Sequence, residues 1–205
     1  SDVCSSDLTD PPYETERGWD IGSEPVVSLD DAVVIDLADP AADPAVAGEA
    51  EVAPSGHYNA IAWTMPKATS GPSEGSVIML VGKAERDGEV VDFTLRLDRE
   101  LRYLGGDYVG EERKGILGEG EEADVEMTFH FDHFFGSDAA PADDEMNVGA
   151  LGFDPLYAIA TDGALDVTLA DLEQQLSAAD FEKIEEFFLH FGHVGEGHAI
   201  AEPLN

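Results

Sequence analysis

Two short stretches of the chain hold five of its six histidines. The first, HFDHFF, contains His130, Asp132 and His133, and the second, HFGHVGEGH, contains His190, His193, Glu196 and His198. Imidazole nitrogens are ligands that Zn²⁺ and copper favour, and three or four of them, with or without a carboxylate, make a metal site. If the two stretches meet in space, the histidines would surround one ion, with the two acidic residues as ligands or as acceptors for an imidazole N–H. The sequence therefore predicts a metal site, with zinc as first choice and copper as second.

The local structure decides which of these side chains point the same way. As a strand, residues 124–135 would place His130 and Asp132 on one face and His133 on the other. A strand that ended near Asp132 would let His133 turn to the same side. The glycines around Glu196 allow the backbone to fold back, so that His193 and the residues after it converge. Because neutral imidazole is the ligating form, metal affinity is expected to weaken as the pH falls through about 6.5.

Each histidine also has an interpretation that needs no metal. The helix dipole favours His190 in the last turn of a helix. His130 fits a hydrogen-bonded residue within a sheet, and the whole HFGHVGEGH stretch fits a solvated tail. His57, after Ser55 and Gly56 at a strand start, fits a surface residue.

Other sites are less favoured. The chain has neither the HExxH order of zinc proteases nor the strict calcium loop of an EF-hand, although Asp36, Asp39 and Asp43 offer oxygens that would suit calcium. Pairs of acids such as Asp143 and Asp144 are expected by chance among 45 acidic residues.

We therefore expect a metal-binding protein rather than an enzyme. The alternatives are a metal-dependent hydrolase, with Glu196 or Asp132 as base at an open site, and a structural or adhesive surface module without a metal.

The net charge excludes several partners. The chain has 45 acidic against 10 basic residues, a formal charge of −35, while 43% of its residues are hydrophobic. Nucleic acids and anionic membranes are poor partners for such a surface, because binding them depends on basic patches. Since salt screens self-repulsion, adaptation to a saline habitat is the simplest interpretation, and surface binding of divalent cations is the second.

The chain ends and the single cysteine limit what the N-terminal region tells us. The first eight residues, SDVCSSDL, match the translation of a common sequencing-library adapter, so residues 1–8 are expected to be an artefact, Cys4 included. We expect the natural chain to begin before Thr9 and to have lost an N-terminal piece. No stretch approaches the roughly 20 apolar residues of a membrane span. A membrane is therefore expected as a partner only through a lipid anchor on the missing piece.

Short strand patterns dominate up to about residue 150. Residues 32–37 and 57–65 are strand-like, and residues 75–86 and 88–98 meet across Asp87-Gly88, the signal of a type I′ hairpin. Residues 124–135 are the longest strand candidate. This spacing predicts a mainly β chain with an antiparallel β-sandwich over residues 9–150.

Helical signals dominate residues 151–205. Asp154 is expected to be the N-cap and Pro155 the first residue of a short helix. Thr168 to Asp171 has capping-box spacing, and Ser177 is expected to cap a longer helix that stops at Gly192. We expect this part to form a short α-helical layer of the same domain.

The stretches GHYNAIAWTM, GEVVDFTLRLD and VEMTFHFDHFF together resemble the layout of the methanobactin-associated periplasmic copper-binding (MbnP-like) family. The resemblance covers about residues 18–150. It implies an exported β-sandwich, periplasmic or extracellular and attached as a lipoprotein, that handles copper or another metal with His130 among the ligands. Related copper proteins have an oxidisable tryptophan two residues before a ligand histidine, and here that position is Thr128.

Overall fold

The structure of the protein is a computed structural model, which describes residues 27–29, 31–41, 45–50, 52–58, 60–106, 116–194 and 197–204. The presumed adapter segment, Cys4, Asp43 and Glu196 lie outside the described residues, so the predictions made for them have no structural counterpart here. None of the helices described is long and apolar enough to cross a bilayer.

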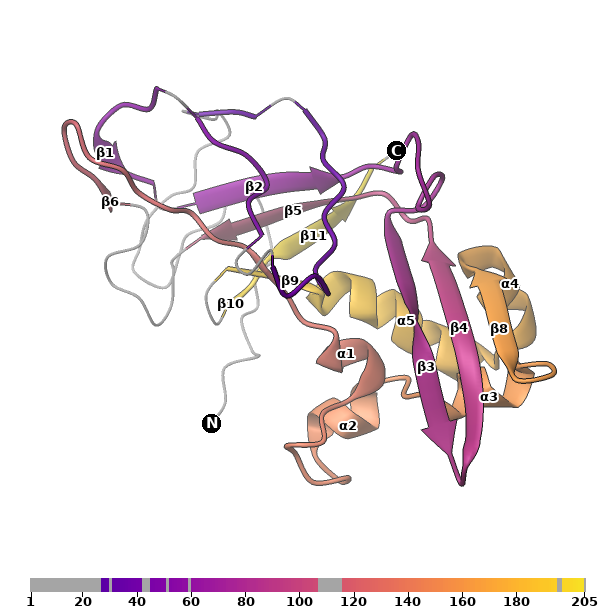
Figure 1. Ribbon diagram of the computed structural model, residues 1–205. Coiled ribbons are helices and arrows are strands. Elements are labelled where there is room, and N and C mark those ends of the chain that lie inside the picture. Colours follow the sequence, from indigo (N-terminus) through magenta and orange to yellow (C-terminus); the bar gives the residue numbers. More distant parts are fainter. Residues whose placement is uncertain are drawn as a thin grey trace.

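A three-stranded sheet forms one side of the molecule (Figure 1) and consists of β3 (Ile78–Arg86), β4 (Glu89–Leu97) and β8 (Ala164–Thr168). β3 and β4 are an antiparallel hairpin, as predicted. Asp87 and Gly88 both have positive φ, 55° and 84°, which a type I′ turn requires. β8 joins β4 in parallel, after a connection that contains three helices. One face of β4 is buried, and its apolar side chains alternate with polar ones as the sequence predicts.

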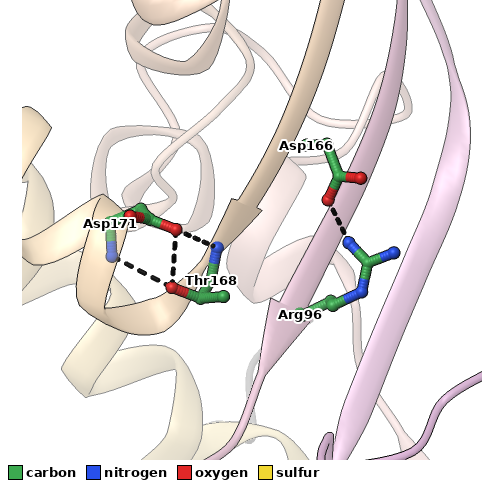
Figure 2. Close-up of polar contacts among 4 residues, drawn as sticks. All are labelled: Arg96, Asp166, Thr168 and Asp171. Atoms are coloured by element: carbon green, nitrogen blue, oxygen red, sulfur yellow. Dashed lines mark hydrogen bonds and ion pairs between the residues drawn. The ribbon is translucent and has the colours of Figure 1, made fainter.

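The junction between β8 and the helix α4 (Leu169–Gln175) shows the predicted capping box (Figure 2). The Thr168 hydroxyl accepts the backbone N–H of Asp171, and the Asp171 carboxylate accepts the backbone N–H of Thr168. These bonds satisfy N–H groups that a helix start otherwise leaves without partners. An ion pair between Arg96 and Asp166 also joins β4 to β8 (Figure 2).

A second three-stranded sheet contains β2 (Ala60–Met65), β5 (Leu101–Gly106) and β11 (Ile200–Pro203), all antiparallel (Figure 1). Two smaller sheets complete the described strands. One pairs β1 (Gly56–His57) with β6 (Ile116–Leu117), and the other has the order β10 (Gly197–His198), β9 (Gly192–Val194), β7 (Thr128–Phe129). The last of these sheets carries His193 and His198 of the second histidine stretch.

Five helices are described: α1 (Asp132–Phe135), α2 (Glu145–Gly149), α3 (Asp154–Ile159), α4 and α5 (Ala178–His190). Ser177 caps α5 as predicted, since its side chain accepts the N–H of Asp180. The cap predicted for α3 is wrong by one residue, because Phe153 is the N-cap and Asp154 is already helical. α5 packs against α1, α4, β9 and β11, so it links the β3–β4–β8 side to the histidine-bearing sheet.

One hydrophobic core connects the β3–β4–β8 sheet and the β2–β5–β11 sheet with α5. Leu95 and Leu97 of β4, Leu101 and Tyr103 of β5, and Ile184 of α5 are at most 1% exposed. The Tyr103 hydroxyl is buried with them and donates to the carbonyl of Phe188. Burial raises the pKa of Tyr103, so this hydroxyl stays protonated. The core therefore anchors both ends of the segment that supplies three of the histidines.

The coarse prediction of a mainly β chain holds, because strand outweighs helix and all strand pairings except β4 with β8 are antiparallel among the described residues. The strand predicted at 32–37 is wrong, since these residues have no regular structure. Of residues 124–135 only Thr128 and Phe129 are in a strand, and α1 follows. The described strands form four small sheets, and β8 to β11 lie in the part that was expected to be helical.

Candidate metal centre

The two histidine stretches meet in the structure because β7 and β9 are paired. His193 of β9 lies opposite Thr128 of β7, and the backbone N–H of His130 donates to the carbonyl of Phe191 at 3.0 Å. The rings of His130 and His193 are therefore stacked, with centroids 3.8 Å apart and planes 4° from parallel. The strand pairing alone brings one histidine from each stretch together.

His133 reaches the same place because the strand ends early. Phe131 has helical dihedral angles, φ −78° and ψ −11°, and α1 begins at the next residue. The buried ring of Phe134 holds α1 against α5, edge-on to Phe187 with centroids 5.0 Å apart. His133 thus lies with its ring centroid 6.1 Å from that of His130, on the same side instead of the opposite face of a strand.

His190 and His198 join the other three histidines from α5 and β10. His190 is the last residue of α5, and His198 on β10 pairs with His193 across the β9–β10 sheet. Their ring centroids are 4.9 Å apart, and the rings of His198 and His193 are 4.3 Å apart. The structure thus brings together all five histidines expected at the site, and we call them the histidine cluster: His130, His133, His190, His193 and His198.

Within this cluster, the ligand atoms of three residues lie close enough together that the group could hold a metal ion. One ligand atom each from His130, His133 and His193 lies within 4.8 Å of the other two. To bind one tetrahedral zinc ion with Zn–N bonds of about 2.0–2.1 Å, these nitrogens must come closer together. The stacked rings of His130 and His193 must also rotate out of their parallel planes, since imidazole lone pairs lie in the ring plane. The arrangement can hold a divalent cation without a change of fold.

His193 is the most completely buried of the cluster, with 0% of its surface exposed. Its Nε2 lies 3.0 Å from the carbonyl oxygen of His190, so Nε2 carries the proton and donates it. The other nitrogen, Nδ1, then has a free lone pair, and this nitrogen is buried. A backbone carbonyl that fixes the tautomer in this way is typical of histidines that bind metals.

Three buried ring nitrogens of the cluster lack a hydrogen-bond partner among the described residues: His193 Nδ1, His133 Nε2 and His198 Nε2. A buried polar atom without a partner costs about 1–3 kcal/mol. Such atoms are rare in native structures, and an ion is one of the established explanations. Trp63 Nε1 and Thr128 Oγ1 are also buried without a partner among the described residues, but only the three imidazole nitrogens are of a type that could bind a cation.

Burial also keeps these rings in the form that binds metals. Desolvation, followed by the charge of His130, lowers the pKa of His193 to about 3. Desolvation lowers the pKa of His198 to about 4 and lowers that of His133 as well. Acid therefore competes with a metal for these rings only at a lower pH than the value of about 6.5 expected from the sequence.

Asp132 is beside the cluster but makes no hydrogen bond to the ring of His130. Its Oδ1 lies 3.8 Å from His130 Nδ1, too far for a hydrogen bond, and accepts the backbone N–H of His133 at 3.0 Å.

In the loop considered for calcium, the carboxylates of Asp36 and Asp39 each accept a backbone N–H two residues further on. Those two bonds are typical of turns and do not require calcium.

The sequence-based argument missed two features of the site. The His190 carbonyl orients His193, and a backbone group of this kind has no signal in the residue pattern. Gly192 follows the C-cap Phe191 in the C′ position, as predicted, but it also starts β9, which the sequence did not indicate. A Cβ at Gly192 would lie 2.8 Å from the rings of Trp63 and Tyr103, so close approach is what requires glycine here.

Comparison of the chain with protein-family models, with curated proteins and with solved structures found no match.

Proposed function

We propose that this protein binds a divalent transition-metal ion at the histidine cluster, with zinc as first choice and copper as second. The observation that carries the proposal is the convergence of five imidazole rings in which three buried nitrogens have no partner among the described residues. A metal ion supplies one partner to several such nitrogens at once.

The donor set supports these two metals. Neutral imidazole suits zinc and copper better than magnesium or calcium, which prefer oxygen ligands. His130, His133 and His193 are the first ligands by distance. His190 and His198 lie beside them and supply further nitrogens, and Asp132 stands close enough to His130 to accept from its ring after a small movement.

Binding is a better conclusion than catalysis. A catalytic zinc keeps a position open for water, commonly with three protein ligands. Five rings around one place offer more ligands than an open site uses, which favours a protein that holds or carries the ion over the alternative of a metal-dependent hydrolase.

The cellular location, the family and the detailed architecture expected from the sequence are part of this proposal. It comprises export to the periplasm or the cell exterior, attachment as a lipoprotein, membership of the MbnP-like proteins, and a two-sheet sandwich with a helical C-terminal layer. The resemblance over residues 18–150 and the strand content support it. Fractionation of cells that express the complete gene tests the location, and recovery of the protein in the cytosol would contradict it.

Calorimetric titration of the untagged chain with zinc tests the binding. We expect at least one zinc ion per chain, and an affinity more than about 10- to 100-fold lower for His133→Gln, because changes beyond the ligands themselves already cost that much. His57→Gln is the matched control, since His57 lies on β1 in another sheet. Salt near 1 M suppresses binding to surface carboxylates.

The outcome that opposes the proposal is equal zinc affinity for the wild-type chain and the His133→Gln variant. Circular dichroism of the wild-type chain and of the His133→Gln variant shows whether a loss of zinc affinity comes from unfolding instead.

A further inference from the structure

The strand β3 is an edge of its sheet. It pairs with β4 on one side and, in the part of the chain that the structure describes, with no strand on the other (Figure 1). In an antiparallel pair the backbone groups of every second residue point toward the partner strand, and those of the residues between them point away. Arg86 and Glu89 flank the two-residue turn as a hydrogen-bonded pair, so the groups that point away from β4 belong to the odd-numbered residues of β3. These residues are Met79, Val81, Lys83 and Glu85.

The outward backbone groups of β3 have no hydrogen-bond partner among the described residues. The side chains of the same residues lie on the open face of the sheet, where Val81 is 66% exposed. Unpaired N–H and C=O groups along an edge are a template for another strand, and native proteins usually cover or interrupt such an edge. The edge of β3 can therefore accept one more strand.

The core-facing side of this edge presents an aromatic ring. Phe93 on β4 lies opposite Gly82, and a Cβ at Gly82 would come within 2.7 Å of the Cζ atom of that ring. The ring of Phe93 therefore reaches across β3 at a position that has no side chain to cover it. Phe93 and its neighbours Phe135 and Phe153 are only partly buried. An apolar side chain on an added strand would complete this packing.

Residues 32–37, AVVIDL, are a strand pattern without a partner strand. They have no regular structure, and three of their apolar side chains are 51–70% exposed. As a strand, the segment would have one wholly apolar face and one mixed face. The apolar face would consist of Val33, Ile35 and Leu37, and the mixed face of Ala32, Val34 and Asp36.

The segment and the edge match in polarity and in charge. With Val34 beside Val81 and Asp36 beside Lys83, the apolar face of the segment lies on the side of the Phe93 ring. Residues 28–39 contain four Asp and no Lys or Arg, while β3 carries Lys83 and Arg86, two of the 10 basic residues of the chain. Strands with a basic side chain are scarce in a chain of formal charge −35, so this edge suits an acidic segment.

From these observations we infer that the protein forms a symmetric dimer, in which residues 32–37 of each copy add a parallel strand to the β3 edge of the other copy. The segment is not paired with β3 of its own chain, so a second copy supplies it. Each copy gives one segment and accepts one, so the arrangement closes on itself. The inference is independent of the metal site.

Sedimentation velocity of the full chain over a range of concentrations tests the dimer, in salt near 1 M to screen the repulsion between chains. We expect the wild-type protein to reach the mass of two chains of 21.9 kDa each. Val33→Asp should raise the dissociation constant more than about 100-fold, because each dimer would bury two carboxylates against aromatic rings. Val52→Asp is the matched control, since Val52 is 85% exposed and lies outside the segment.

A variant of the edge tests the other half of the interface. Val81→Pro removes an N–H that points away from β4 and leaves the bonds between β3 and β4 in place. It should give a monomer, while circular dichroism shows whether the sheet persists. A mixture of Val33→Asp and Val81→Pro should form a dimer again, because the first chain has an intact edge and the second an intact segment.

Three outcomes contradict the inference. The first is a wild-type chain that stays monomeric at every concentration. The second is a dimer that Val33→Asp leaves intact, since β3 would then pair with a different strand. The third is an equal loss in Val33→Asp and Val52→Asp, which would assign the effect to added charge. If Val81→Pro does not fold, the comparison of Val33→Asp with Val52→Asp still decides.

Discussion

At the scale of single residues, His193 shows how a buried imidazole is prepared for a ligand. The carbonyl of His190 accepts a hydrogen bond from Nε2–H of His193, and complete burial keeps the ring neutral. A neutral ring with a fixed tautomer presents one lone pair in one direction. The sequence identifies His193 as a possible ligand, but the orientation of its ring comes from a backbone carbonyl in the preceding helix.

The lowered pKa of His193 predicts that the metal-free protein loses stability in mild acid. The unfolded chain takes up a proton near pH 6.5 and the folded chain only near pH 3, so between these values the unfolded state binds more protons. Stability therefore falls as the pH falls through this window, by about 1.4 kcal/mol per pH unit for this residue. Urea unfolding of the wild-type chain and of His193→Gln at pH 7.5, 6.0 and 5.0 measures the difference in slope.

Both chains contain the same carboxylates, so the comparison isolates the histidine. Identical slopes in the two chains would show that His193 titrates normally in the folded state.

At the scale of elements, the turn from β7 into α1 and the start of β9 position the cluster. An early end of β7 puts His133 beside His130, and Gly192 lets β9 approach β2 and β5 closely. Both features come from packing against neighbours, because the aromatic rings on α5, β2 and β5 leave no other room.

Gly192→Ala tests the close approach. Its Cβ would meet the rings of Trp63 and Tyr103 at 2.8 Å, and we expect the free energy of unfolding to fall by about 1–3 kcal/mol, as for other overpacked sites. Since His193 is the next residue, zinc affinity should fall too. Urea unfolding and zinc titration of the variant measure both effects.

Gly149→Ala, at the end of α2, is the control, because its added Cβ has nothing within 4 Å. It should leave stability unchanged or raise it by up to about 1 kcal/mol. An equal loss in both variants would mean that glycine is needed at Gly192 for some reason other than space.

At the scale of the whole molecule, the charge imbalance dominates the surface. Every lysine and arginine that the structure describes already has a partner. Lys183 donates to the backbone carbonyls of Val148 and Ala150. The other six pair with carboxylates: Lys67, Lys83, Arg86, Arg96, Arg99 and Arg102. With 45 acidic residues in the chain, most carboxylates have no cation to pair with. Their mutual repulsion opposes folding at low salt.

We therefore expect salt to stabilise the protein. Exposed ion pairs are worth only about 0–1 kcal/mol each, so screening the repulsion should outweigh weakening the pairs. Urea midpoints should rise between low salt and about 1 M NaCl, where the screening length falls to about 3 Å. A midpoint that falls with salt would contradict this account.

Magnesium chloride at matched ionic strength tests the second interpretation of the acidic surface. An equal midpoint in both salts indicates screening alone. A higher midpoint in magnesium indicates that the surface binds divalent cations.

The elements that could be predicted were those whose signals lie within a few residues. The β3–β4 hairpin follows from Asp87-Gly88 between alternating runs, and α4 and α5 follow from Thr168 and Ser177 as caps. Turn dihedrals and cap hydrogen bonds are local, so the residues that make them are neighbours in the chain. The segment 32–37 is mostly exposed and pairs with no strand in the part of the chain that the structure describes, so its apolar residues alone did not make a strand.

By itself the sequence determined which side chains are available as ligands, an acidic surface, and five histidines in two groups. Only the tertiary structure decided that β7 pairs with β9, that α1 replaces the end of a strand, and that His133 lies between two pairs of rings. Pairing between segments 60 residues apart depends on the packing of the whole core, and the pattern along either segment leaves that choice open.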